Sequence, residues 1–251
     1  MSLNVWIIGA SQGIGLELAK YYLKHNHSVI ISAREIEKYP ILSSLKNEYQ
    51  EQVDFINMDV TNTLSVKLAM QKAWKCYGHL DICIYNAGIY EAMPIDEWNL
   101  EHFENMNQVN HMGAIRVLTE IVPLFKEQAR GHLVFNASIS SYLGLPYGGG
   151  YSAPKAALLN FCESIEPELA TFNIKVQVIN HGFVKTRLTQ KNDFNMPQLL
   201  EPKEAAVKIY EGVMHSKKFE IKFPWALTRF LTFLQMLPYG ISLNLTKKAL
   251  K

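Results

Sequence analysis

A tyrosine and a lysine four residues apart are the side chains in this sequence best suited to moving a proton. Tyr151 and Lys155 open a long helical pattern, so their side chains project from the same helix face. A phenol exchanges protons poorly near neutral pH, and a nearby ammonium group favours the phenolate. The pair is therefore a candidate general acid and base, tuned by Lys155. Because Pro154 lacks a backbone N–H, it is tolerated only in a first helical turn, which predicts a helix that begins near Gly150.

A glycine-rich turn follows the first apolar run of the chain. It comprises Gly9-Ala-Ser-Gln-Gly13-Ile-Gly15. Gly9 would end a strand in a tight turn, Gly13 would let backbone N–H groups approach a pyrophosphate, and Gly15 would let the following helix pack closely on a sheet. The motif predicts a dinucleotide site, although an ordinary glycine turn that caps a strand has the same composition.

Short β-rich runs alternate with longer helical patterns along the chain. This alternation predicts an α/β fold, a Rossmann-type doubly wound parallel sheet of about seven strands with helices on both faces. Ligands of such sheets bind outside the carboxyl ends of the strands, where the polar motifs of this chain lie. The predicted strands are Asn4–Ile8, Ser28–Ser32, Val53–Asn57, Asp81–Tyr85, His132–Asn136, Lys175–Asn180 and Phe219–Lys222, and the predicted helices cover 13–25, 40–50, 62–77, 98–128, 151–172 and 203–215.

Composition narrows the class of protein. A net charge of +2 and a pI of 8.3 give no electrostatic footprint for nucleic acid. The three cysteines, Cys76, Cys83 and Cys162, are odd in number and lack metal-ligand spacing, so we expect reduced thiols and no metal site. Because a structural strand is predicted from Asn4, no signal peptide is expected and a cytoplasmic location is favoured.

The spacing of the glycines and of Tyr151 and Lys155 resembles the short-chain dehydrogenase/reductase family. The turn of that family usually starts Thr-Gly, and Ile8 replaces the threonine here. The resemblance covers residues 3–222 and implies an oxidoreductase that transfers hydride between NAD(P)(H) and a ketone, aldehyde or secondary alcohol. It makes Tyr151 the acid and base, while Lys155 also reaches the nicotinamide ribose.

The same resemblance assigns two further catalytic residues. Ser138 stands thirteen residues before Tyr151, as in the family, and would hold the carbonyl oxygen in the transition state, with Ser140 and Ser141 as competitors. Asn110 matches the asparagine that binds a water in the proton relay behind the lysine. A helical asparagine that bonds backbone is the alternative for Asn110.

The segment after the second predicted strand bears on the choice of cofactor. An acidic side chain there would accept hydrogen bonds from the ribose 2′-hydroxyl and repel a 2′-phosphate, but this chain has Ser32-Ala-Arg34. Arg34 can pair with a phosphate and Ser11 can add a hydroxyl contact, so NADP(H) is favoured over NAD(H). Glu35 beside Arg34 leaves open that Arg34 is a solvated loop charge.

Three further segments resemble family contacts to the cofactor. Asp59-Val60 matches an adenine contact, and Asn86-Ala87-Gly88 matches the Asn-Asn-Ala-Gly motif with Tyr85 in place of its first asparagine. Asn180-His-Gly-Phe-Val-Lys-Thr186 resembles Asn-Pro-Gly-x-Val-x-Thr, which contacts the nicotinamide carboxamide, and His181 in place of proline predicts a less rigid turn. The predicted cofactor contacts are Gly9, Ser11, Gly13, Ile14, Gly15, Arg34, Asp59, Val60, Asn86, Ala87, Gly88, Tyr151, Lys155, Gly182, Val184 and Thr186.

Residues 188–200 form a polar segment that predicts a mobile lid over the site. Apolar residues in this segment and on the predicted rim favour an apolar, lipid-like substrate, although they are equally suited to ordinary packing. The predicted rim residues are Tyr90, Met93, Leu143 and Tyr147.

Residues 223–251 are predicted to be an amphipathic extension of a single domain that covers 1–222. Its apolar stretch nears the length of a membrane span, but Arg229 alone costs about 2.5 kcal/mol at mid-bilayer, so a full span is disfavoured. The extension is expected to cover the substrate cleft, to dock on a second subunit or to lie on an anionic membrane, in which case the protein would be peripheral on the cytoplasmic face. Thr228, Thr232 and Gln235 form one predicted face, Leu227, Phe230, Leu231, Leu234 and Leu237 form the other, and Lys247, Lys248 and Lys251 follow.

Family members commonly pair through the long helices that correspond to 98–128 and 151–172, so the resemblance implies a homodimer or homotetramer. Two other classes of function remain open. One is an NADP(H)-sensing binding protein without catalysis, and the other is a membrane-surface scaffold with the same fold. Sensors of this kind typically lack the tyrosine or the lysine, and this chain keeps both.

Overall fold

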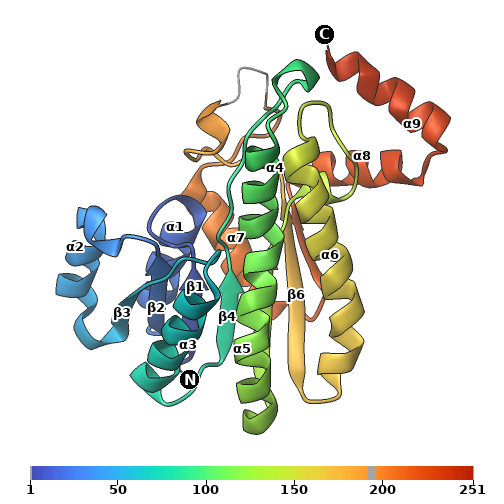
Figure 1. Ribbon diagram of the computed structural model, residues 1–251. Helices are drawn as coiled ribbons and strands as arrows, with labels where there is room; N and C mark the ends of the chain where they lie inside the picture. Colours follow the sequence, from blue (N-terminus) through green and yellow to red (C-terminus); the bar gives the residue numbers. More distant parts are fainter. Residues whose placement is uncertain (1, 192–195, 251) are drawn as a thin grey trace.

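The protein is built on a parallel sheet whose strand order is β3-β2-β1-β4-β5-β6-β7, with helices on both faces (Figure 1). The computed structural model describes residues 2–191 and 196–250. The order reverses between β1 and β4, which is the switch point where such sheets bind ligands. The predicted fold class is therefore confirmed. The strands are β1 Asn4–Ile8, β2 Ser28–Ala33, β3 Val53–Asn57, β4 Ile82–Tyr85, β5 Gly131–Asn136, β6 Ile174–His181 and β7 Glu220–Phe223.

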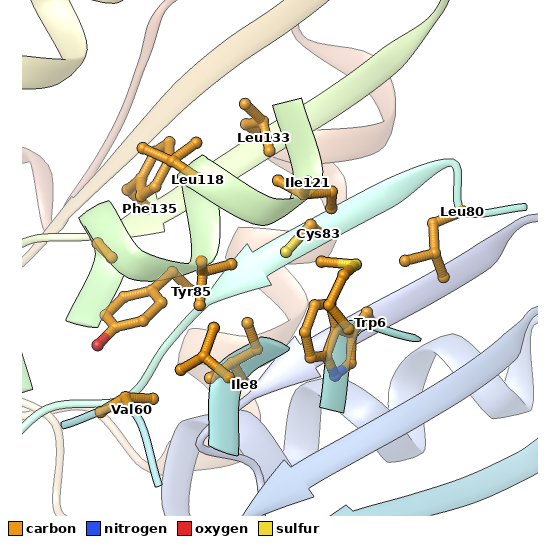
Figure 2. Close-up of a cluster of buried hydrophobic side chains, with 14 of the residues drawn as sticks. Trp6, Ile8, Val60, Leu80, Cys83, Tyr85, Leu118, Ile121, Leu133 and Phe135 are labelled. Atoms are coloured by element: carbon orange, nitrogen blue, oxygen red, sulfur yellow. The ribbon is translucent and has the colours of Figure 1, made fainter. Parts of the chain in front are cut away.

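Side chains alternate across each strand, so the sheet buries a separate apolar layer on each face. Trp6 and Ile8 of β1 pack into the core under the helices α3, α5 and α6, and Val5 and Ile7 pack into the core under α1, α2 and α7. Figure 2 shows part of the first core, including Trp6 and Ile8. These helices are α1 Gly13–Lys24, α2 Pro40–Tyr49, α3 Thr63–Tyr77, α5 Gly113–Gln128, α6 Gly149–Ala170 and α7 Pro202–His215.

The helix predicted over 98–128 is present from Leu100 to Gln128, but its middle is a π-helical turn that the sequence did not predict. The chain forms α4 Leu100–Asn107, then a π-helical turn Gln108–Met112, and then α5. A π turn holds an extra residue and is common at functional sites. The side chain of Asn110 in this turn exchanges two 2.9 Å hydrogen bonds with the backbone of Ile89, in the loop after β4. Apolar periodicity does not report such a single-residue insertion.

Helix α6 begins at Gly149, one residue before the predicted start. Pro154 therefore falls in the second turn, not in the first. Because proline has no N–H, the carbonyl of Gly150 receives no helical hydrogen bond from position 154. Tyr151 lies in the first turn of the helix.

The C-terminal extension forms α8 Trp225–Met236 and α9 Tyr239–Thr246, which lie at one edge of the molecule, beyond α6 (Figure 1). None of the helices in the described parts of the chain is long and apolar enough to cross a bilayer. The predicted faces of α8 are wrong in part, because Thr228 is buried and Phe230 is 56% exposed. Thr228 donates its hydroxyl to the carbonyls of Pro224 and Trp225, so its burial leaves no polar group unpaired.

Candidate active site

The carboxyl ends of the strands border one large cavity, with a volume of about 1470 Å³. Most of the predicted site residues line it, whereas Gly15 and Asn110 lie behind its wall. The predicted residues in the wall are Gly9, Ser11, Gly13, Ile14, Arg34, Asp59, Val60, Asn86, Ala87, Gly88, Ser138, Tyr151, Lys155, Gly182, Val184 and Thr186.

The glycine turn after β1 is shaped by close backbone contacts. Gly9 has a φ of 83°, and a Cβ there would lie 2.6 Å from the Cα of Ala87. A Cβ at Gly15 would lie 2.5 Å from the carbonyl oxygen of Gly9. Helix α1 starts at Gly13, so its first backbone N–H groups have no intrahelical acceptor and are available at the cavity. This arrangement fits the pyrophosphate of a dinucleotide.

A chain of hydrogen bonds connects this turn to the candidate catalytic lysine. The Asn86 side chain donates to the Gly9 carbonyl at 2.6 Å, and the Asn136 side chain donates to the Asn86 amide oxygen at 2.8 Å. The Lys155 Nζ in turn donates to the Asn136 carbonyl at 2.6 Å. Asn136 was missed at the sequence level, although it is a polar residue at the end of an apolar strand.

Tyr151 and Lys155 lie together, with the lysine Nζ 5.8 Å from the centroid of the tyrosine ring. Burial lowers the pKa of Lys155 to about 7. Burial also raises the pKa of Tyr151 to about 12, against a hydrogen bond with Ser138 that lowers it. The direction is opposite to the expected effect of the lysine charge, because desolvation disfavours the charged form of both groups. Tyr151 is therefore a protonated phenol at neutral pH.

Ser138 is held by a polar cluster behind the cavity. Its backbone N–H donates to the Asn180 amide oxygen at 3.2 Å, and the Asn180 amide nitrogen donates to Glu220 at 2.8 Å. The hydroxyl of Tyr142 donates to the same carboxylate oxygen. Burial opposes ionisation of Glu220, but hydrogen bonds from Tyr142, Asn180 and Lys222 outweigh it and lower its pKa. Sequence analysis missed Tyr142 and Glu220, which follow no motif.

Asn110 lies behind the cavity wall on the lysine side. A Cβ at Gly88 would lie 3.3 Å from the Asn110 amide oxygen and 3.7 Å from Lys155 Nζ, so both side chains lie close to Gly88. The Asn110 side chain bonds the backbone of Ile89, which is the alternative that the sequence left open. Its role in holding a relay water stays a prediction.

A cationic side chain borders the cavity just after the end of β2. Arg34 is exposed and lines the cavity. Glu35 forms an ion pair at 2.5 Å with Lys38, one turn further along. Asp59 also lines the cavity, and its carboxylate accepts hydrogen bonds from the backbone and hydroxyl of Thr61, at 2.9 Å and 2.8 Å.

His181, which stands where the family motif has proline, has two partners in the structure. Its ring stacks on Phe223 with centroids 6.1 Å apart, and its Nδ1 donates to the Gly182 carbonyl at 2.7 Å. Burial lowers the pKa of His181 to about 4, so the ring is neutral at pH 7.

The remaining wall of the cavity combines apolar residues with a few polar ones, among them Glu97, Asn105 and Arg187. Of the four predicted rim residues, Tyr90 and Tyr147 line the cavity. Met93 is buried, and Leu143 packs against α8, so these two do not line it. Leu188 and Thr189 of the predicted lid border the cavity, but residues 192–195 lie outside the described chain. Leu227 and Leu231 of α8 also form part of the wall.

Comparisons with known proteins agree with this geometry. The short chain dehydrogenase family model matches residues 3–196. An uncharacterized oxidoreductase of Staphylococcus haemolyticus is 34% identical over 80% of this chain and 86% of its own length. Another, of Myxococcus xanthus, is 31% identical over 88% of this chain and 87% of its own length.

Solved structures share the fold over most of their length. ElxO with NADP bound is 27% identical with a TM-score of 0.80, over 88% of this chain and 98% of that chain. A short-chain dehydrogenase from Streptomyces avermitilis is 21% identical with a TM-score of 0.85, over 98% and 96% of the two chains. The resemblance found in the sequence is confirmed: the chain belongs to the short-chain dehydrogenase/reductase family of NAD(P)-dependent oxidoreductases.

Proposed function

We propose that this protein is an NADP(H)-dependent reductase or dehydrogenase that acts on an apolar ketone, aldehyde or secondary alcohol. The observation that carries the proposal is the arrangement of Tyr151, Lys155 and Ser138 at one end of a cavity whose other end is the glycine turn. One end provides proton chemistry and the other provides a phosphate cradle, as hydride transfer from a nicotinamide requires.

In the direction of reduction, Tyr151 donates its phenolic proton to the carbonyl oxygen of the substrate. A pKa of about 12 keeps this proton in place at neutral pH. Ser138 binds the same oxygen and stabilises the charge that develops on it. Lys155, held by the Asn136 carbonyl, orients the ribose and favours the phenolate that remains after proton transfer. The bound nicotinamide supplies the hydride.

Arg34 supports the preference for NADP(H). Its exposed guanidinium lies at the end of β2, where a ribose 2′-phosphate needs a cation. Glu35 is engaged by Lys38 and so is less able to repel that phosphate. ElxO, the 27% identical relative, binds NADP.

The apolar part of the wall supports the class of substrate. Tyr90, Tyr147, Leu227 and Leu231 line the same cavity. Such a wall favours alkyl or ring-bearing substrates over sugars or charged acids, because a polar group buried there would lose its hydrogen bonds to water.

A substrate screen tests the proposal. The purified chain is incubated with NADPH or NADH and with ketones and aldehydes of increasing alkyl length and ring size, and nicotinamide absorbance is followed. We expect NADPH oxidation that is fastest with the larger apolar carbonyls. Tight NADPH binding without turnover of any substrate would instead identify a cofactor-sensing protein, and faster turnover with NADH would overturn the cofactor preference.

A further inference from the structure

The outer face of α8 and α9 is unusually apolar for a surface. Six large apolar or aromatic side chains in these two helices are at least half exposed, with exposed fractions from 51% to 80%. Exposed apolar groups gathered in one place on a folded protein mark a contact with a partner or a membrane. They are Trp225, Phe230, Phe233, Met236, Tyr239 and Ile241, which we call the outer face.

The outer face points outward because the opposite side of α8 is occupied. Leu231 and Leu234 are buried in a small cluster with Ile139, and Leu227 packs against the same cluster. Thr228 is buried beside them. These contacts fix the rotation of α8 about its own axis, so the aromatic residues cannot turn inward without breaking an existing apolar layer.

The positive charge of the region around α8 and α9 favours an anionic partner. No aspartate or glutamate follows Glu220 in the sequence, whereas four of the 25 lysines and arginines follow Phe223. The region is therefore positive, while the rest of the chain is net negative. Two copies of such a face would repel each other, but an anionic lipid surface would attract it. The basic residues are Arg229, Lys247, Lys248 and Lys251. Lys222 is not among them, because it forms an ion pair with Glu220 at 2.9 Å.

The chemistry of the individual side chains agrees with a lipid–water boundary. The Arg229 guanidinium lies 4.7 Å from the centroid of the Trp225 ring. Trp225 opens α8 and Tyr239 opens α9, and both ring types favour the headgroup level of a bilayer. With 12 and 8 residues, the helices are too short to span a bilayer but suited to lie in its surface.

We propose that the outer face of α8 and α9 binds the surface of an anionic phospholipid membrane, with the aromatic side chains inserted among the headgroups and the basic side chains paired with lipid phosphates. The proposal concerns binding alone and does not depend on the identity of the substrate.

Vesicle co-sedimentation of the full chain tests this proposal. The probes are phosphatidylcholine vesicles with or without about 30% phosphatidylglycerol, at low and high salt. We expect binding to the anionic vesicles, weakened about 10-fold or more when the anionic lipid is omitted, and weakened also by salt. Absence of binding to anionic vesicles would overturn the proposal.

Two matched double variants separate the outer face from general hydrophobicity. Phe230→Ser with Phe233→Ser should lower the vesicle partition coefficient about 10-fold or more. Leu64→Ser with Leu68→Ser, which removes exposed leucines from α3, should leave it unchanged. NADPH binding and circular dichroism verify that both variants are folded. An equal loss in the two variants would contradict the proposal.

Self-association is the rival outcome. Sedimentation velocity without lipid shows whether the chain pairs through the outer face. In that case the Phe230→Ser and Phe233→Ser changes would dissociate a dimer, and the original chain would not bind anionic vesicles. The outer face would then be a subunit interface, and the membrane proposal would be wrong.

Discussion

The glycine turn and the catalytic end of the cavity differ in the groups that they use: the turn uses the backbone, and the catalytic end uses side chains. At the glycine turn, Gly9 and Gly15 act through backbone shape, because a Cβ at either position would collide with neighbouring backbone. At the catalytic end, Tyr151 and Lys155 act through ionisable side chains whose pKa values are displaced by burial. The first end therefore depends on steric precision, and the second depends on keeping polar groups where desolvation disfavours their charge.

The catalytic end should be the more sensitive in turnover. Tyr151→Phe removes the proton donor and keeps the ring, so we expect kcat to fall about 100-fold or more with the Kd for NADPH nearly unchanged. Stopped-flow or steady-state rates, with NADPH fluorescence titration, measure both. Tyr147→Phe, at another cavity-lining tyrosine, is the control and should retain turnover within a few-fold. Full activity of Tyr151→Phe would remove Tyr151 from the mechanism.

The glycine turn should instead be sensitive to a single methyl group. Gly9→Ala combines a positive φ with a collision at the Ala87 backbone, so the free energy of unfolding should fall by about 2–4 kcal/mol. Gly78→Ala is the matched control, since Gly78 has a φ of 74° but no neighbour within 4 Å of its Cβ position. That variant bears the backbone strain alone, about 1–2 kcal/mol. Equal losses in urea unfolding would contradict a steric role for Gly9.

The burial of Lys155 should lower the free energy of unfolding, whereas Gly9 should raise it. Its folded pKa of about 7 lies below the ordinary 10.5, so between these values the unfolded chain binds more protons and stability rises with pH. The cost of burying the charge is complete below pH 7. Lys155→Met should abolish most activity, raise the free energy of unfolding at pH 7 by about 1–2 kcal/mol, and flatten this pH dependence.

Chemical denaturation from pH 6 to 10 measures the effect of Lys155→Met. The exposed Lys72→Met is the control and should leave the pH slope unchanged. A variant that is less stable than the original chain at pH 7 would show that the bond from Lys155 to the Asn136 carbonyl outweighs the desolvation cost.

Substitution of Arg34 tests whether a side chain also contributes to cofactor binding. Arg34→Ala should weaken NADPH binding about 10-fold through loss of the phosphate contact, and should change NADH binding little. Fluorescence titrations with the two cofactors measure the ratio. Arg130→Ala is a control for net charge. Arg130 is exposed, stands just before the amino end of β5 and does not line the cavity. An equal change in both cofactors would remove Arg34 from phosphate recognition.

The sequence predicted the sheet well because each strand is a short apolar run between turn residues, and strand starts and ends agree with the structure within a residue or two. The resemblance to the family identified most of the motif residues that line the cavity, because each motif is a short contiguous segment. The π turn at Gln108–Met112 escaped prediction, since one inserted residue hardly alters the apolar periodicity. Thr228 was placed on the wrong face because threonine can satisfy its hydroxyl on its own helix.

The polar cluster behind Ser138 was invisible for a different reason. Tyr142, Asn180 and Glu220 come from three separate segments, and only the pairing of β6 with β7 brings Glu220 beside Asn180. No spacing in the sequence encodes such a contact. None of these three residues lines the cavity. The cluster acts on the site only through the hydrogen bond between Asn180 and the backbone of Ser138.

Glu220 therefore gives the smallest and most selective prediction. Glu220→Met keeps the length of the side chain but removes the acceptor for Tyr142 and Asn180, which loosens the Ser138 backbone. One hydrogen bond of about 1 kcal/mol corresponds to about five-fold in kcat. KM and the Kd for NADPH should stay unchanged, since a positioning residue affects the transition state and not the binding of cofactor. Glu211→Met, at an exposed glutamate of α7, is the control. If Glu220→Met raises KM and leaves kcat unchanged, the cluster shapes the substrate pocket and does not position Ser138.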